Sequence, residues 1–133
     1  MRRSMAPALL AVALLAPMSN AQPPEWTGAQ TVSVELSNFR FTPATLTLQH
    51  GVVYRLRFSN AASGGHDFVA REFFADANIA PEDRAKVRNG GVDVDGKETV
   101  DVRLMAGRPG TYKSHCSHFM HSSFGMTGTI VVR

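Results

Sequence analysis

The chain has 133 residues, of which 44% are hydrophobic and 19% charged, and its formal net charge at pH 7 is +3. This length and composition fit one globular domain and leave too little chain for two independent cores. The chain has one cysteine, Cys116, which excludes an intramolecular disulfide and also the several thiolates of a zinc finger or an iron–sulfur site.

The first 21 residues have the three parts of a secretory signal peptide. Arg2 and Arg3 give a positively charged start, residues 6–16 form an uncharged apolar run, and small or polar residues lead to a predicted cleavage after Ala21. A membrane anchor is less favoured, because the run is shorter than the about 20 apolar residues that span a bilayer. The arginine pair alone would also fit a twin-arginine export route. We therefore expect residues 1–21 to be removed and the mature protein to be periplasmic.

Removal of this segment changes the charge of the protein. The segment carries two arginines and no acidic residue, so the mature chain keeps 12 lysines and arginines and 11 acidic residues, a net charge of +1. No basic run and no basic stripe with interleaved aromatics is present, so nucleic-acid binding is not indicated. No second apolar stretch approaches spanning length, so we expect no membrane span after processing, and we expect a monomer.

The mature sequence is predicted to consist of many short strands. Residues 22–30 are rich in proline and glycine and form an extended lead-in to a domain over residues 31–133. Strands are predicted from alternating or β-rich sequence over residues 31–36, 39–41, 45–48, 53–58, 67–74, 92–94, 99–104, 111–116 and 127–132. Short strands with frequent turns and few helices indicate a β-sandwich or a barrel.

Residues 75–89 depart from the strand pattern. Pro81 is followed by two acidic residues and then by basic ones, an order that suits a short helix and its dipole. The sequence does not indicate what the insert over residues 75–91 does. After it, Asp95 and Gly96 form a hairpin-like turn between the strands predicted over residues 92–94 and 99–104.

Metal-binding side chains are concentrated in residues 112–128. This window contains three histidines, the only cysteine and two methionines. Thiolate, imidazole and thioether are the ligands that select copper, and a redox copper site uses two imidazoles and one thiolate roughly in a plane with a weak axial thioether. A short loop cannot encircle the ion, so we expect one ligand from elsewhere. His66, where a glycine-rich loop enters a predicted strand, is the candidate.

Two motifs give the chain a resemblance to a known family. The pattern Cys116-x4-His121-x4-Met126, followed by Thr-Gly-Thr-Ile-Val-Val, resembles the cupredoxin (blue copper, plastocyanin/azurin-like) family, and Gly-Gly-His66-Asp-Phe resembles its first copper histidine. The resemblance covers about residues 31–133, with ligand spacing most similar to rusticyanin-like members. It implies an all-β Greek-key β-sandwich with a short helical insert near residues 75–90. It also implies one copper ion near one end, held by His66, Cys116, His121 and Met126.

One residue departs from the family pattern. Cupredoxins often have asparagine after the first copper histidine, and this chain has Asp67. At that position the side chain would tie the ligand loops together, and its negative charge would lower the reduction potential of the metal.

Several other side chains compete for a role at the metal. His118 is expected at the loop surface or beside the ligands, and Met120 could fill a gap in the core, so Met126 is the preferred thioether. His50 and His115 are interpreted as ordinary solvated histidines. Zinc could also occupy a Cys-His-His set, but the methionine, the β-sandwich and the Irving–Williams order favour copper.

The resemblance implies a periplasmic one-electron carrier and not an enzyme. Redox partner proteins would dock near an apolar rim around His121 formed by Phe119, Met120 and Phe124. An envelope copper-binding or delivery protein without redox cycling is the alternative, with His115, His118 and Met120 as a transfer route. The position of His115 also resembles copper nitrite reductases, in which such a histidine serves a second, catalytic copper, but no further histidine lies near His66 in the sequence.

Overall fold

The computed structural model describes residues 13–18, 22–118 and 120–133 of the chain. Most of the predicted signal peptide, residues 1–12 and 19–21, lies outside the described residues. Within the described ranges, no helix is long and apolar enough to cross a membrane.

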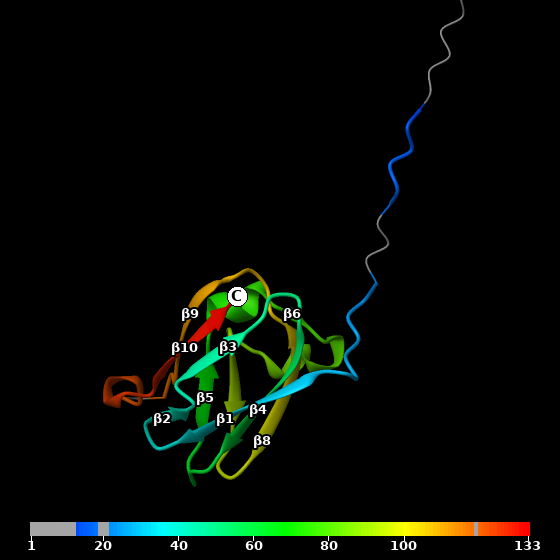
Figure 1. The fold of residues 1–133 in the computed structure, drawn as a ribbon. Coiled ribbons are helices and arrows are strands. Elements are labelled where there is room, and N and C mark those ends of the chain that lie inside the picture. Colours follow the sequence, from blue (N-terminus) through cyan, green and yellow to red (C-terminus); the bar gives the residue numbers. More distant parts are fainter. Residues whose placement is uncertain (1–12, 19–21, 119) are drawn as a thin grey trace, which may run out of the picture.

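In the described part of the chain, ten strands form two five-stranded sheets, so the predicted all-β sandwich is confirmed (Figure 1). The first sheet has the order β2 (Arg40–Thr42), β1 (Gln30–Ser37), β4 (Val53–Asn60), β8 (Thr99–Met105) and β6 (Asn78–Ile79). The second sheet has the order β3 (Thr45–Leu48), β10 (Thr127–Val132), β9 (Gly110–His115), β5 (His66–Val69) and β7 (Gly91–Val94). Among the residues that the structure describes, three short helices complete the fold: α1 (Arg71–Asp76), η1 (Pro81–Lys86) and η2 (Ser122–Phe124).

Period-two alternation in the sequence explains which faces of the strands meet. In β4, Tyr54, Leu56 and Phe58 are buried while Arg55 and Arg57 between them are half-buried, because successive strand residues point to opposite faces. Apolar side chains from both sheets fill the space between them, including Val34, Leu36, Phe41, Phe68, Val92, Leu104 and Ile130. This core fixes the two sheets against each other and therefore fixes the loops at their ends.

The strand predicted over residues 67–74 is only half correct. β5 ends at Val69, and helix α1 begins at Arg71. Phe73 and Phe74 are both buried, with ring centroids 5.3 Å apart. Two consecutive residues of a strand cannot both face one core, whereas in a helix they lie only about 100° apart and can. Burial of both rings therefore favours the helix.

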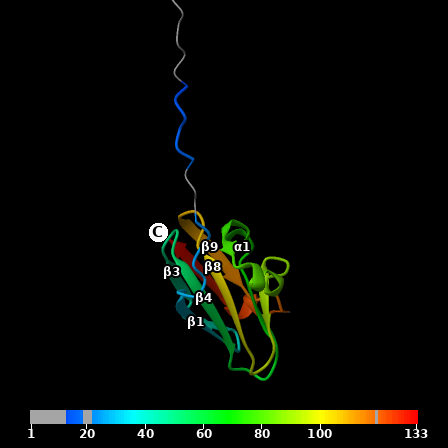
Figure 2. The same ribbon diagram turned by 90° about the vertical axis from the view of Figure 1, so that its right-hand side faces the viewer.

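The insert, in which the sequence predicts a short helix, follows α1 (labelled in Figure 2) and holds β6 (labelled in Figure 1) and the short 3-10 helix η1. η1 has Pro81 at its start, acidic residues in its first turn and basic residues in its last, as the sequence predicted. Asp83 joins it to β8, since its Oδ2 accepts hydrogen bonds from the backbone N–H and the Nε of Arg103 at 2.9 and 2.8 Å. Lys86 donates to Oδ1 of the same carboxylate at 2.8 Å.

The turn predicted at Asp95 and Gly96 is present, since the N–H of Glu98 donates to the carbonyl of Asp95 at 3.0 Å, but the predicted hairpin is wrong. The strands on either side of it lie in different sheets, because β7 pairs with β5 whereas β8 pairs with β4 and β6. A Cβ at Gly96 would stand 2.0 Å from the carbonyl oxygen of Ser63, so glycine is needed for close approach to the 61–64 loop. Lys97 also donates its backbone N–H to Ala62. The connection is therefore a packed crossover between the sheets.

Candidate metal centre

Cys116 follows directly after β9 and is fully buried. Its backbone N–H donates to the carbonyl of Met126 at 3.1 Å, and the N–H of Met126 donates to the carbonyl of His121 at 3.0 Å. These two bonds close the loop between β9 and β10. They hold the backbones of all three loop residues of the predicted ligand set close together.

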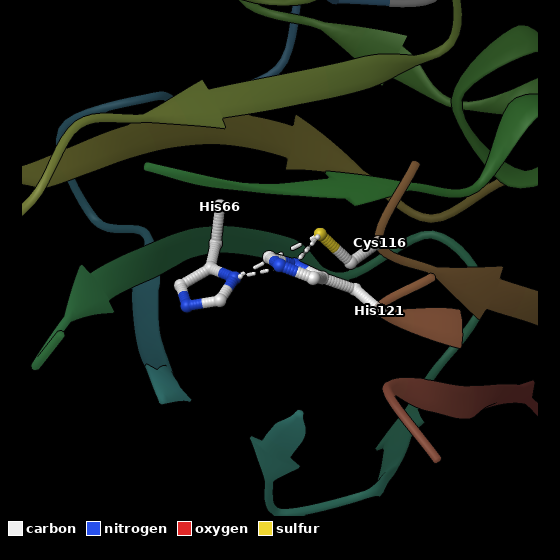
Figure 3. Close-up of side chains that lie close together, drawn as sticks. All are labelled: His66, Cys116 and His121. Atoms are coloured by element: carbon white, nitrogen blue, oxygen red, sulfur yellow. Dashed lines mark hydrogen bonds between the residues drawn. The ribbon is translucent and has the colours of Figure 1, made fainter. Parts of the chain in front are cut away.

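Three of the four predicted ligands converge on one point from separate parts of the chain (Figure 3). His66 is the first residue of β5, Cys116 directly follows β9, and His121 lies in the loop after it. The Nδ1 atoms of His66 and His121 are 3.1 Å apart, and Sγ of Cys116 lies 3.8 and 3.3 Å from them. Such a cluster cannot arise from local sequence alone, since His66 lies 50 residues before Cys116 in the sequence and approaches it because β5 pairs with β9.

The spacing of these atoms fits a single metal ion. The circle through the three donors has a radius of about 2.0 Å, the length of a metal–nitrogen bond, so they are spaced as ligands of one ion are. Two imidazoles and a thiolate around one point are the equatorial set of a type 1 copper ion. The donor set fits one such ion per chain.

Burial shifts the pKa values of both His66 and Cys116 in the direction that favours their uncharged forms. The pKa of His66 is lowered first by burial and then by the electrostatic influence of the neighbouring His121 and His118 imidazoles. Burial raises the pKa of the Cys116 thiol, and hydrogen bonds from the backbone N–H groups of Asp67 and His118 oppose that rise. A metal bound to the thiolate would therefore release a proton. Nδ1 of His66 is the nitrogen that faces the other donors. Its Nε2 is buried without a hydrogen-bond partner among the described residues.

Asp67 links the two halves of the cluster, as predicted from the sequence. It is buried in β5 beside His66, and its Oδ1 accepts a hydrogen bond from the backbone N–H of Ser117 at 2.6 Å. The Ser117 hydroxyl donates to the other carboxylate oxygen. These bonds connect Asp67, which follows His66, to Ser117, which follows Cys116. They therefore limit how far β5 and the loop can move apart.

The two methionines near the site differ sharply in burial. Met126 is fully buried, whereas Met120 is 47% exposed. The buried methionine shares backbone hydrogen bonds with Cys116 and His121, which keeps it at the cluster. This difference is consistent with Met126 as the preferred thioether.

The remaining histidines lie outside the three-atom cluster. His118 is exposed, and its ring centroid lies 6.2 Å from that of His66 and 5.4 Å from that of His121. His50 is exposed, as expected, and contacts the carbonyl of Gly107 at the other end of β9. His115 is half-buried rather than fully solvated, because β9 pairs with strands on both of its sides.

Sequence reasoning missed Phe39 as a residue of the site. Alternation grouped it with Phe41, but only Phe41 is in β2 and buried; Phe39 precedes the strand with φ of 61° and is 42% exposed. Its ring meets that of His121 edge-on at 5.2 Å and lies 5.2 Å from that of Phe124, which is 60% exposed. Phe39, Met120 and Phe124 form what we call the apolar rim. Phe119, also predicted there, lies outside the described residues.

Comparison with solved structures identifies similar folds. Auracyanin from the photosynthetic bacterium Roseiflexus castenholzii is 19% identical with a TM-score of 0.59, over 80% of this chain and 99% of that one. Auracyanin B is 24% identical with a TM-score of 0.57, over 86% and 95%. A multicopper oxidase from the hyperthermophile Aquifex aeolicus is 17% identical with a TM-score of 0.60, over 87% of this chain and 32% of the oxidase. These likenesses support the fold.

Comparison by sequence gives the family. A search of curated proteins finds no match to this chain. The family model of the cupredoxin-like domain, in contrast, matches residues 7–132. Since that match spans nearly the whole sequence, the chain belongs to the cupredoxin-like domain family.

Proposed function

We propose that this protein is a periplasmic one-electron carrier with a mononuclear type 1 copper held by His66, Cys116, His121 and Met126. The observation that carries the proposal is the convergence of two imidazole nitrogens and one thiol sulfur at mutual distances of 3.1–3.8 Å. Copper bound there would supply a one-electron couple whose potential the axial ligand tunes. The auracyanins of similar fold include one whose description calls it a "blue" copper protein.

The surrounding protein restrains the positions of the donor side chains. His66 lies in a sheet, Cys116 is fixed by backbone hydrogen bonding to Met126, and Asp67 ties the two regions together. Donors that keep one geometry need little rearrangement when the charge of the metal changes, which favours fast electron transfer. The buried sulfur is also shielded from solvent, which protects the thiolate from side reactions.

The apolar rim is the proposed docking surface for redox partner proteins. His121 is half-buried beneath it, so the rim is the side on which a donor ligand comes nearest to solvent. Apolar side chains at this position exclude water from the contact and leave few charges to desolvate. We propose export by the signal peptide of residues 1–21, and we propose that the carrier has no catalytic activity. His50 and His115 lie away from the cluster, which argues against a second copper.

A copper-delivery protein is the second candidate, favoured by the exposure of His118 and Met120 beside the cluster. Voltammetry and electron self-exchange measurements on the copper-loaded protein separate the two functions. Fast, reversible one-electron cycling is expected of the carrier. Slow or irreversible cycling, with Cu(I) donated to an apo acceptor protein, would replace the carrier with the delivery function.

A further inference from the structure

One exposed imidazole lies beside the buried donors, and the proposed electron-carrier function gives it no role. The His118 ring lies nearly parallel to that of His66, with an interplanar angle of 24°, and is tilted by 36° to that of His121. We propose that His118 is the entry ligand for copper: it binds the incoming ion at the surface and passes it to the buried donors. This inference rests on the proposed copper site.

The buried donors are difficult for a hydrated ion to reach directly. Cys116 is fully buried, His66 is 3% exposed, and the imidazole of His121 is half-buried. Water molecules bound to the ion must be replaced one at a time, and an accessible ligand is needed for the first replacement. Of the described residues around the cluster, His118 combines a solvent-exposed side chain with an imidazole, a group that copper favours.

The position of His118 is set by the same loop that carries the ligands. Its carbonyl accepts the backbone N–H of His121 at 3.0 Å, so the two residues are joined within one turn. On its other side, the ring lies against Gly65, where an added Cβ would stand 3.5 Å from its Cε1 atom. The imidazole is thus held between the residue before His66 and the start of the turn that presents His121.

His118 is close to the donors without being one of them. Only His66, Cys116 and His121 have ligand atoms that all lie within 4.8 Å of one another among the described residues. An ion on His118 would therefore have to leave it to reach all three donors. This is the arrangement expected of a transient ligand, which speeds binding and release without adding to the final affinity.

The transfer is a ligand exchange without a change of oxidation state. Copper first forms a bond to an imidazole nitrogen of His118. Bonds to His121 and His66 then form as water leaves the ion, the Cys116 thiol gives its proton to solvent as the copper–sulfur bond forms, and the bond to His118 breaks. Each bond made to the ion replaces another, so no outside oxidant or reductant is required.

Metal uptake by the apo protein tests the inference. Mature apo protein is mixed with Cu²⁺ in a stopped-flow instrument, and the visible thiolate-to-copper charge-transfer band is followed. We expect His118→Ala and His118→Gln to slow the appearance of the band by about tenfold or more, because a ligand held at the site raises the local concentration of copper. His50→Ala, which removes an exposed imidazole at the other end of β9, is the matched control and should load at the wild-type rate.

Copper removal provides the second measurement. A ligand that binds copper only transiently changes the loading and release rates by the same factor. In the His118 variants, copper removal by a chelator should therefore slow by the same factor as loading, and the copper affinity should stay unchanged. Equal loading rates for wild type and both His118 variants would overturn the inference. A shifted band with weaker copper affinity would also overturn it, because His118 would then be a permanent ligand. Absence of the band from the wild type would overturn the proposed function itself.

Discussion

Asp67 places a carboxylate between the two halves of the candidate metal centre. It follows His66 in β5, and its two oxygens accept hydrogen bonds from the backbone and side chain of Ser117. An asparagine would keep the backbone link through its amide oxygen, and its NH2 group could donate to the Ser117 hydroxyl in place of the bond that the carboxylate accepts, so that the charge is lost while the link is kept. A substitution at Asp67 can therefore separate the effect of the hydrogen bonds from the effect of the negative charge on the metal.

Asp67→Asn is predicted to raise the reduction potential of the copper. A negative charge near the site stabilises Cu(II) over Cu(I), and one unit charge a few ångströms away at an effective dielectric constant of about 20 amounts to on the order of 100 mV. Voltammetry measures the potential. Ser117→Ala, which removes one hydrogen bond and no charge, is the control and should shift the potential much less. An unchanged or lower potential in Asp67→Asn would refute the electrostatic role.

The two methionines give a paired prediction about the axial ligand. Met126→Leu should keep the visible band but raise the reduction potential, because a thioether that stabilises Cu(II) is lost while the buried volume is nearly conserved. Met120→Leu changes an exposed side chain and should leave the potential unchanged. The measurement is voltammetry of both variants. A shift in the second variant and none in the first would assign the thioether to Met120.

Among the elements, η1 and β8 are joined by the carboxylate of Asp83. Burial acts to raise its pKa, but hydrogen bonds from Arg103 and Lys86 outweigh burial and lower the pKa from 3.8 to about 2. A folded-state pKa below the unfolded value means that the stabilisation is present above about pH 4 and is lost as the pH falls toward 2. The shift corresponds to about 2 kcal/mol.

Asp83→Asn is therefore predicted to lower the free energy of unfolding by about 2 kcal/mol at neutral pH. Urea unfolding of wild type and variant at several pH values measures the difference, which should shrink between pH 4 and pH 2. Glu82→Gln, at a 70% exposed partner of Arg103, should have little effect. A difference that stays constant down to pH 2 would show that the charge of Asp83 is not the cause.

The elements also show what local sequence can and cannot predict. Alternation over residues 53–58 predicts β4 and its buried face, because a half-buried strand has a period of two. Alternation does not show where a strand ends, so it extends the strand at residue 67 wrongly through Phe73 and Phe74. A turn signal at Asp95 and Gly96 does not state which sheet the next strand joins. That choice depends on contacts with the distant 61–64 loop.

For the whole molecule, the site depends on how distant segments of the chain meet: β5, β9 and β10 bring the ligands together within one sheet, and the connection between β1 and β2 of the other sheet adds Phe39. The spacing of Cys116, His121 and Met126 is visible in the sequence because one loop carries all three. His66 comes from the start of another strand; its position after a glycine-rich loop makes it a candidate, and the resemblance to cupredoxins implies the same residue. The role of Phe39 at the site could not be predicted from the sequence, because its contact with His121 exists only in the folded sandwich. The same holds for the stacking of His118 on His66.

Copper binding is predicted to stabilise the entire fold, because its ligands are brought together only in the folded chain. A ligand present at about 1,000 times its dissociation constant adds about 4 kcal/mol to the free energy of unfolding. Thermal unfolding of the apo and copper-loaded proteins measures the increment. Cys116→Ser should lose most of it, whereas His50→Ala should retain it. Equal melting temperatures with and without copper would show that these residues do not hold the metal.

The most direct test of the central claim is the visible absorption and electron paramagnetic resonance spectrum of the mature protein loaded with Cu²⁺. The account predicts one copper per chain and an intense thiolate-to-copper charge-transfer band that is absent from Cys116→Ser. His66→Ala and His121→Ala should weaken or shift that band. One bound copper per chain without an intense visible band, or the same band in Cys116→Ser, would contradict the assignment of a type 1 copper centre.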